Sequence, residues 1–192
     1  MADTVRRRWT LAEFLAWENE QETRHEFVGG QIRAMVGASR GHNKIARNVL
    51  AYLYARLGNG KCQPYGSDMK IIIPAGNVRY SDVMIDCGPE KPDDIAATAP
   101  TVAIEVLSKS TAYVDQTQKL ADYQSIPSMQ HVLHLVQERA EGELWTRTGE
   151  SWRRTSLVGL DAEVDLAAIG VAFTLAIAYE GVALDDAEAN DP

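Results

Sequence analysis

The stretch Thr101-Val-Ala-Ile-Glu-Val-Leu107 decides how this chain is interpreted. Apart from Glu105, the run from Val102 to Leu107 is apolar and short, a pattern consistent with a strand buried on both faces. An ionised glutamate is almost never fully buried without a partner or a metal ion. Glu105 therefore indicates a functional site or, in the alternative, a strand end or edge that faces water.

A second acid stands at the head of the preceding apolar run, Ser81-Asp-Val-Met-Ile-Asp86. If Asp82 and Glu105 point into one cleft, their carboxylates could hold a single Mg²⁺, which usually takes one or two protein carboxylates and keeps several waters. Asp86 shares the strand face of Asp82 but lies roughly 13 Å farther along, too far for the same ion. The alternative for Asp82 is an aspartate that caps a turn.

The rest of the chain supplies helices and strands around these two runs. A capping-box spacing at Thr10-Leu-Ala-Glu13 and apolar residues at helical spacing predict helices over 10–18, 42–57 and 111–125. Turn signals, first of all Gly29-Gly30, separate the expected strands 24–28, 31–36, 69–73, 80–87, 101–107, 129–136, 142–145 and 152–158. This order predicts an α/β (α+β) fold, a mixed β-sheet flanked by helices.

Length and charge restrict the classes of protein. The 192 residues fit one domain, expected over 1–184, and the acidic residues 185–192 have the composition of a disordered tail. The net charge of −8 disfavours a protein that simply coats nucleic acid. The longest near-apolar stretch, 169–179, is too short to cross a bilayer, and no signal peptide is visible, so a cytoplasmic protein is expected.

The two cysteines, Cys62 and Cys87, lie on separate candidate strands. They do not form a close metal-binding pair, and disulfides are rare in a reducing cytosol. We therefore expect two buried thiols that act as small hydrophobic side chains.

The run Tyr80-Ser-Asp-Val83, followed by Ala103-Ile-Glu-Val-Leu-Ser-Lys-Ser-Thr111, resembles the PD-(D/E)XK nuclease superfamily and, within it, the Uma-type (Uma two) restriction endonuclease family. The likeness spans roughly residues 10–136. Further support comes from Arg24-His-Glu-Phe-Val-Gly-Gly-Gln-Ile32, the helix that opens at His42, and Asp115 with Lys119 and Tyr123. The resemblance implies a sheet with flanking helices, a metal-bound water as nucleophile, Mg²⁺ (or Mn²⁺) as cofactor, and hydrolysis of phosphodiester bonds in DNA.

The resemblance also implies roles for particular residues. Asp82 and Glu105 take the places of the metal ligands, and the carbonyl of Val106 adds a backbone ligand. Glu26 matches an early glutamate that supports the metal or a water. Its alternative is a surface partner for a nearby arginine, Arg24 or Arg33.

One departure concerns the catalytic lysine, which in the superfamily stands two residues after the glutamate, where this chain has Leu107. Lysine there would stabilise developing negative charge and orient the attacking water. Lys119, on the following helix, matches the family's relocated lysine and is favoured over Lys109. Its alternative is an exposed helical pair with Asp115.

Weaker candidates for substrate binding lie at the start of the helix over 42–57. His42 could contact a phosphate or a site water, or could simply be a residue at the helix start. Arg40, Lys44 and Arg47 form a basic stripe that could bind a DNA backbone, although a solvated helix face is the favoured explanation. His131 and His134 differ by three positions, so a strand turns them to opposite faces and they form no metal pair.

Three functions remain open at this stage. The first is an Mg²⁺-dependent endonuclease-like hydrolase acting on DNA, and the second is a non-catalytic interaction module that retains the nuclease fold. The third is a phosphodiesterase for small nucleotides. A homodimer is expected for cutting both strands of a duplex, with 164–179 as its interface or, alternatively, as a helix packed in the core.

Overall fold

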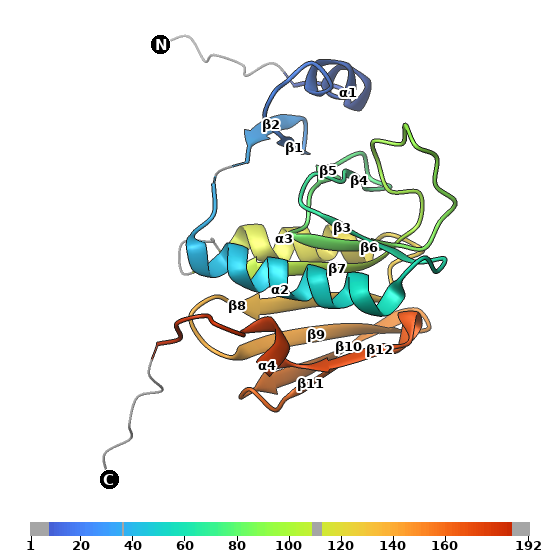
Figure 1. Ribbon diagram of the computed structural model, residues 1–192. Coiled ribbons are helices and arrows are strands. Elements are labelled where there is room, and N and C mark those ends of the chain that lie inside the picture. Colours follow the sequence, from blue (N-terminus) through green and yellow to red (C-terminus); the bar gives the residue numbers. More distant parts are fainter. Residues whose placement is uncertain (1–7, 36, 109–112, 186–192) are drawn as a thin grey trace.

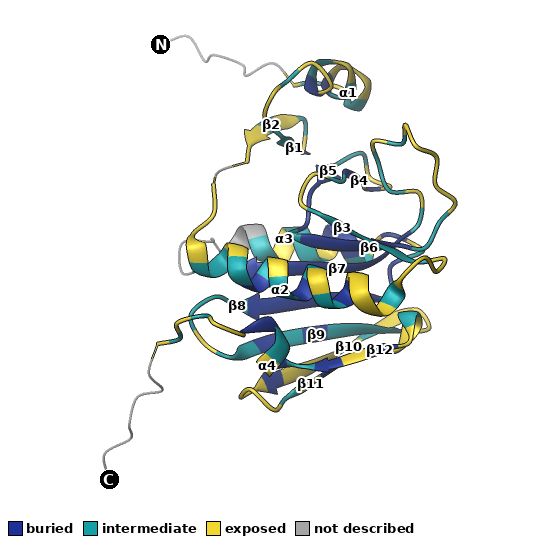
Figure 2. Cartoon of the chain, in the orientation of Figure 1, coloured by how far each residue is buried: buried dark blue, intermediate teal, exposed yellow. Residues whose placement is uncertain are grey.

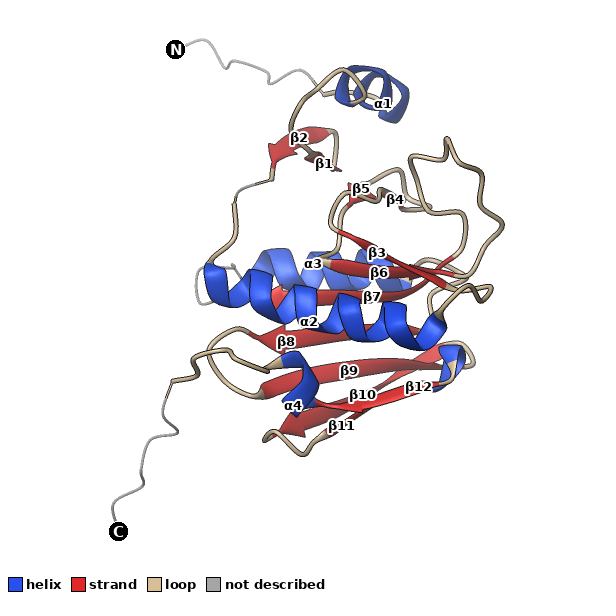
Figure 3. Cartoon of the chain, viewed as in Figure 1, coloured by secondary structure: helices blue, strands red, loops and turns tan. Residues whose placement is uncertain are grey.

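The computed structural model describes residues 8–35, 37–108 and 113–185, without the side chains of 113–115. Its helices are α1 (Leu11–Glu18), α2 (Arg40–Leu57), α3 (Tyr113–Gln124) and α4 (Leu175–Ala178), with a short 3-10 helix, η1 (Ala167–Ile169). Its strands are β1 (His25–Val28), β2 (Gln31–Ala34), β3 (Gln63–Gly66), β4 (Ile71–Ile72), β5 (Val78–Arg79), β6 (Val83–Asp86), β7 (Pro100–Leu107), β8 (His131–Val136), β9 (Glu141–Thr148), β10 (Ser151–Val158), β11 (Glu163–Leu166) and β12 (Val171–Thr174) (Figures 1 and 3).

A six-stranded mixed sheet forms the centre of the molecule, in the order β10-β9-β8-β7-β6-β3. Only β7 and β8 run parallel, joined through α3, and the other neighbours are antiparallel. A parallel pair needs a crossover connection, and a helix commonly supplies it. The expected mixed sheet flanked by helices is confirmed, and all three longer predicted helices occur within about two residues of their expected ends.

Strand β7, in the middle of this sheet, is buried on both faces, as its apolar run predicted (Figure 2). Val102, Ile104 and Val106 point to the face covered by α2 and by the C-terminal segment, where they join the largest apolar cluster. Ala103 points to the opposite face and packs with Tyr123 of α3. Glu105 shares this second face because alternate side chains of a strand point the same way.

A smaller sheet, β2-β1-β5-β4, carries the N-terminal part of the chain together with α1 (Figure 1). The predicted capping box is present, since Thr10 accepts a hydrogen bond from the amide of Glu13 and its own amide donates to the Glu13 carboxylate. The β1–β2 turn places Gly29 and Gly30 at φ of 57° and 81°, which only glycine adopts without strain. This sheet presents Glu26 towards α3.

The segment 164–179 is not one helix, so that alternative is wrong. It forms β11, η1, β12 and α4, and its side chains Val164, Leu166, Phe173 and Leu175 are buried in the main apolar cluster. The alternation of apolar and polar residues in β11 buries every second side chain, as a strand of period two requires. These four side chains are therefore not available for a homodimer interface.

The expectation of two free thiols is also wrong, because Cys62 and Cys87 form a disulfide. Neither residue lies within a strand. Cys62 directly precedes β3 and Cys87 directly follows β6, and these strands pair antiparallel with Gln63 opposite Asp86. The pairing register thus brings the two α-carbons within 4.0 Å of each other, although 25 positions separate them in the chain.

Among the described helices, none is long and apolar enough to cross a membrane. Residues 186–192 of the expected tail lie outside the described part of the chain. Asp185 is described, and its amide donates a hydrogen bond to the carbonyl of Glu138 at 2.8 Å.

Candidate active site

Two acids face each other where β6 begins and β7 approaches its end. Val83 lies opposite Ile104 in the antiparallel register, so Asp82, one residue earlier, stands opposite Glu105. In the parallel register on the other side, Glu105 lies opposite His134 of β8. Side chains of paired residues point to the same face. The strand register therefore brings Asp82, Glu105 and His134 into one row on the α3 face of the sheet.

Two groups hold the Asp82 carboxylate. Its Oδ2 accepts the amide N–H of Val106 at 2.7 Å, and its Oδ1 lies 2.9 Å from Nε2 of His42 in the first turn of α2. The amide contact fixes Asp82 beside the peptide that follows Glu105. The turn-capping alternative for Asp82 thus gives way to a cross-strand contact, and His42 joins the site as the sequence suggested.

Lys119 of α3 contacts the Glu105 carboxylate directly. Its Nζ lies 2.9 Å from Oε1 and 3.0 Å from Oε2 of Glu105, and the hydroxyl of Tyr123 donates to Oε1 at 2.6 Å. Lys119 and Tyr123 are four positions apart, so one face of α3 delivers both. Lys109, the other candidate lysine, lies outside the described residues.

Glu26 connects the smaller sheet to this lysine. Its Oε1 lies 3.2 Å from Nζ of Lys119, and its Oε2 accepts a hydrogen bond from the guanidinium of Arg79 at 2.8 Å. Nε of Arg79, whose side chain is fully buried, donates to Asp122 of α3 at 2.7 Å. The partner of Glu26 is therefore Arg79 rather than the surface arginines suggested as its alternative.

Sequence reasoning missed Arg79 and Asp122. Asp122 follows Lys119 by three positions, so its place on the same helix face was a usable signal. Arg79 gave none, because the two-residue strand β5 has no readable pattern. Together they tie α3 to the smaller sheet, and this tie sets where Lys119 and Glu26 meet.

The charges around the site shift the pKa values of its groups. Burial, reinforced by the negative charge of Asp82, raises the pKa of Glu105 to about 7 in spite of Lys119. Burial alone would lower the pKa of Lys119, but the charges of Glu105 and Glu26 outweigh it and raise that pKa. Burial would raise the pKa of Glu26, yet Lys119 and Arg79 hold it below its ordinary value. Lys119 is thus a fixed cation between two acids.

The pKa values of the two histidines of the site, His42 and His134, are shifted in opposite directions. Burial opposes the charged form of His42, but the hydrogen bond to Asp82 and the neighbouring carboxylates raise its pKa. Burial and the positive charge of Lys119 lower the pKa of His134 to about 4. His134 is therefore neutral at pH 7.

These side chains surround a small cavity of about 170 Å³. Its lining comprises His42, Asp82, Glu105, Val106, Leu107, Gln116, Lys119 and His134. The predicted substrate-binding residues Arg40 and Lys44 do not belong to it. Arg40 is exposed at the first position of α2, and Nζ of Lys44 donates to the carbonyl of Gly181.

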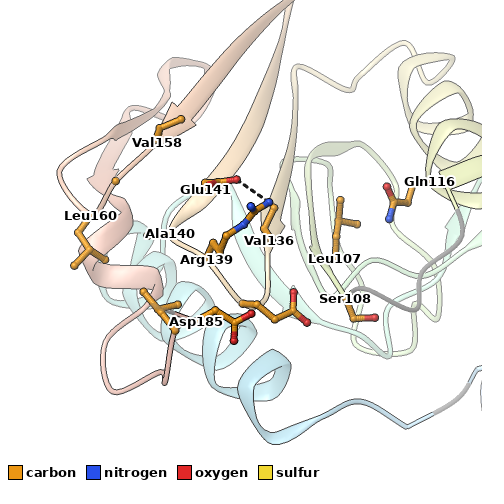
Figure 4. Close-up of a pocket in the computed structure, with 13 residues that line it drawn as sticks. Leu107, Ser108, Gln116, Val136, Arg139, Ala140, Glu141, Val158, Leu160 and Asp185 are labelled. Atoms are coloured by element: carbon orange, nitrogen blue, oxygen red, sulfur yellow. Dashed lines mark ion pairs between the residues drawn. The ribbon is translucent and has the colours of Figure 1, made fainter. Parts of the chain in front are cut away.

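A larger groove of about 960 Å³ lies beside the cavity and shares Leu107 and Gln116 with it (Figure 4). Its charged lining is mainly acidic: Glu138, Glu141 and Asp185 stand against Arg139, which forms a 3.2 Å ion pair with Glu141. An acidic lining repels phosphate groups. This groove is therefore a poor path for a nucleic-acid backbone.

The donor set fits a hard divalent cation that keeps several waters. Two facing carboxylates, Asp82 and Glu105, and the carbonyl of Val106 are oxygen donors of the kind Mg²⁺ takes. Among the residues that the structure describes, no group of three His, Cys, Asp or Glu side chains is arranged to hold a metal. Any cation here would depend on these two acids, on the carbonyl of Val106 and on water.

Comparisons with known proteins agree with this architecture. Two proteins of Synechocystis sp. are similar in sequence. The uncharacterized protein sll1609 is 33% identical over 161 residues, covering 81% of this chain and 91% of that protein. The uncharacterized protein slr1290 is 31% identical over 174 residues, covering 89% and 91%.

A crystal structure from Anabaena variabilis, described as a "putative nuclease" of the DUF820 family, shares the fold. The TM-score is 0.72 at 15% identity, over 88% of this chain and 97% of that one. The family model Uma2, described as "Putative restriction endonuclease", matches residues 11–178, nearly all of the described chain and both candidate acids. The chain therefore belongs to the Uma2 family of nuclease-like proteins.

Proposed function

We propose that this protein is a divalent-cation-dependent endonuclease that hydrolyses phosphodiester bonds of DNA, with Mg²⁺ or Mn²⁺ as its cofactor. The observation that carries the proposal is the opposition of Asp82 and Glu105 in one cavity, with Lys119 against Glu105. Glu105 is buried, and the half-buried carboxylate of Asp82 lies beside it. Burial first, and then the negative charge of Asp82, raises the pKa of Glu105, which reflects the electrostatic cost of its ionised form. A bound divalent cation would relieve it.

Asp82, Glu105 and the carbonyl oxygen of Val106 would hold the cation. Such a cation, when bound, lowers the pKa of water and offsets negative charge on the phosphate in the transition state. Lys119 keeps its proton, since two carboxylates raise its pKa. Its Nζ can therefore donate a hydrogen bond to the attacking water or to a phosphate oxygen, the role of the superfamily's lysine.

The remaining residues keep this lysine in place. Glu26 contacts Nζ of Lys119 in addition to Glu105, and Arg79 holds Glu26 in turn. Both contacts are mostly or fully buried, so solvent does not compete strongly for them. Arg79 is a positioning residue here, because it acts on the site through Glu26 and through Asp122 of α3.

The proposal includes a homodimer, since cutting both strands of a duplex requires two sites. The burial of the β11–β12 side chains means that its interface would use other surfaces.

Cleavage assays with Glu105→Gln test the proposal. Plasmid and single-stranded DNA are incubated with Mg²⁺ or Mn²⁺, and a chelator provides the metal-free state. We expect cleavage by the unmodified protein, loss of cleavage with the chelator, and loss in Glu105→Gln. The matched control is Glu143→Gln, an acid on the same sheet face that pairs with Arg154 at the surface and does not line the cavity.

Other results would favour other functions. Undiminished cleavage by Glu105→Gln contradicts the assignment. Absence of both cation binding at millimolar concentration and DNA binding, measured by calorimetry, indicates a non-catalytic interaction module. Hydrolysis of a small phosphodiester without cleavage of DNA indicates a phosphodiesterase for small nucleotides.

A further inference from the structure

His134 is the one imidazole of β8 that points at the candidate active site. It lies opposite Glu105 in the β7–β8 register, lines the 170 Å³ cavity, and is only 7% exposed. Among the residues that the structure describes, its ring has no hydrogen-bond partner. Its ring nitrogens are not among the fully buried side-chain atoms that lack a partner, so the ring, which lines the cavity, is accessible to a molecule that enters it.

The contrast with His131, three positions earlier on the same strand, shows what a structural histidine looks like here. His131 is 2% exposed, and both of its ring nitrogens have partners. Nδ1 lies 3.2 Å from the hydroxyl of Thr146, and Nε2 accepts the amide N–H of Ala168 at 3.2 Å. The protein therefore supplies hydrogen-bond partners to His131, whereas His134 can form hydrogen bonds with a molecule that enters the cavity.

The neighbours of His134 sharpen this contrast. Val132, Leu133 and Leu135 are fully buried and apolar, so an aliphatic side chain would suit position 134 if packing alone mattered. An imidazole at this position places an N–H donor in the cavity that holds Lys119 and Glu105. An imidazole carries at least one N–H donor in its neutral and in its charged form, so this capacity to donate does not depend on its protonation state.

We propose that His134 is a substrate-binding residue of this site, whose ring N–H donates a hydrogen bond to an oxygen of the scissile phosphodiester. The inference rests on the proposed phosphodiester hydrolysis and adds to it a residue on the β8 side of the cavity. Asp82, with His42 behind it, approaches from the β6 side and Lys119 from α3. His134 would complete the enclosure of the phosphate from the third side.

Three variants test this role. His134→Leu removes the donor and keeps an apolar volume, whereas His134→Asn and His134→Gln retain an N–H at different reaches. We expect kcat/KM for DNA to fall about 10- to 100-fold in His134→Leu, the range for losing a hydrogen bond to a charged group. At least one amide variant should recover part of that loss. The melting temperature of His134→Leu should not fall, whereas His131→Leu, which loses two partners, should melt earlier.

A second measurement does not depend on turnover. The ring resonances of His134, His131 and His42 are followed by NMR while a phosphorothioate dinucleotide is added in the presence of Mg²⁺. We expect the His134 signals to move and those of His131 to stay. Movement at His42 without movement at His134 overturns the inference, as does an unchanged kcat/KM in His134→Leu.

The same two measurements separate this inference from the proposed function. Cleavage by the unmodified protein with no effect at position 134 removes His134 from the site and leaves the nuclease assignment intact. No cleavage and no movement of any ring signal contradicts both.

Discussion

Two buried clusters of this molecule use the same three kinds of side chain. Under α1, the carboxylate of Glu18 lies 2.8 Å from Nζ of Lys70 and accepts the hydroxyl of Tyr80 at 2.7 Å. In the candidate site, Glu105 has the corresponding contacts with Lys119 and Tyr123. A glutamate, a lysine and a tyrosine at these distances therefore do not by themselves make an active site.

The two clusters differ in what surrounds the trio. Glu18 has a second cation, Arg24, at 3.8 Å, and its pKa is lowered because its hydrogen bonds and these charges outweigh burial. Glu105 has a second acid, Asp82, and its pKa is raised. Glu105 also lines a cavity, whereas the hollow beside the α1 cluster is lined by Lys70 and Tyr80 but not by Glu18. The α1 cluster balances its acid with two cations, whereas the other cluster is the one in which we propose a cation site.

The largest effect is expected from Glu18→Gln. The substitution leaves the ammonium of Lys70, whose side chain is 3% exposed, without its counter-charge. Breaking a buried ion pair in this way costs about 3–5 kcal/mol. Urea unfolding should show this loss, while cleavage measured at a temperature where the variant is folded should stay near the unmodified rate. A loss of cleavage at full stability would mean that the α1 cluster belongs to the site.

The lysines allow a direct comparison of the two clusters. Lys119→Met removes the cation that contacts Glu105 and the proposed donor to the water or phosphate, and losing one such donor lowers kcat about 100- to 1000-fold. Lys70→Met should lower stability and leave kcat of the folded fraction within about threefold, since Lys70 does not line the catalytic cavity. Circular dichroism establishes that both variants are folded in the assay. Equal effects on kcat would remove the distinction between the clusters.

The raised pKa of Glu105 predicts how stability depends on pH. In the metal-free protein, folding raises this pKa from 4.5 to about 7, so the folded state binds the proton more tightly than the unfolded state. The stability that this group contributes is fully present below pH 4.5 and is lost as the pH rises through 7. The glutamine of the Glu105→Gln variant cannot ionise, so this variant does not lose that stability as the pH rises.

Relative to the unmodified protein, Glu105→Gln should therefore gain about 2–3 kcal/mol in unfolding free energy between pH 5 and pH 8. Denaturant unfolding at the two pH values measures this gain. Mg²⁺ should stabilise the unmodified protein more at pH 8 than at pH 5, because the cation competes with the proton for Glu105. A gain that fails to appear would mean that Glu105 is ionised throughout this range and that Lys119 alone compensates it.

How far the sequence predicted this arrangement depends on the range of each interaction. Glu105 was visible because a charge interrupts a local apolar run, and Asp82 because an acid stands at the head of the preceding run. That the two share a face was only a condition in the sequence, and the β6–β7 register of the structure meets it. Lys119 was favoured from resemblance, and the structure places it against Glu105. All of these inferences use patterns within a few residues of one strand or helix.

The features that were missed depend on pairing between distant segments. The Cys62–Cys87 disulfide follows from the β3–β6 register, and β3, with the sequence Gln-Pro-Tyr-Gly, shows no strand pattern. The link from Arg79 to Asp122 joins a two-residue strand to a helix 43 positions away. The sequence showed only that His134 cannot form a metal-binding pair with His131. The β7–β8 register is needed to show that His134 lies beside Glu105.

The smallest effects are expected from removing the hydroxyl groups of Tyr80 and Tyr123, one from each cluster. Tyr80→Phe removes the hydroxyl from a glutamate with a lowered pKa, so about 1.5 kcal/mol of stability should be lost at neutral pH, with no change in cation binding. Tyr123→Phe removes a donor that lowers the pKa of Glu105, so that pKa should rise further. Titration calorimetry with Mn²⁺ should then show binding that begins at a higher pH in Tyr123→Phe than in Tyr80→Phe. Identical binding curves for the two variants would show that the hydroxyl of Tyr123 does not affect cation binding, and that the distinction between the trios rests on Asp82, Arg24 and the cavity at Glu105.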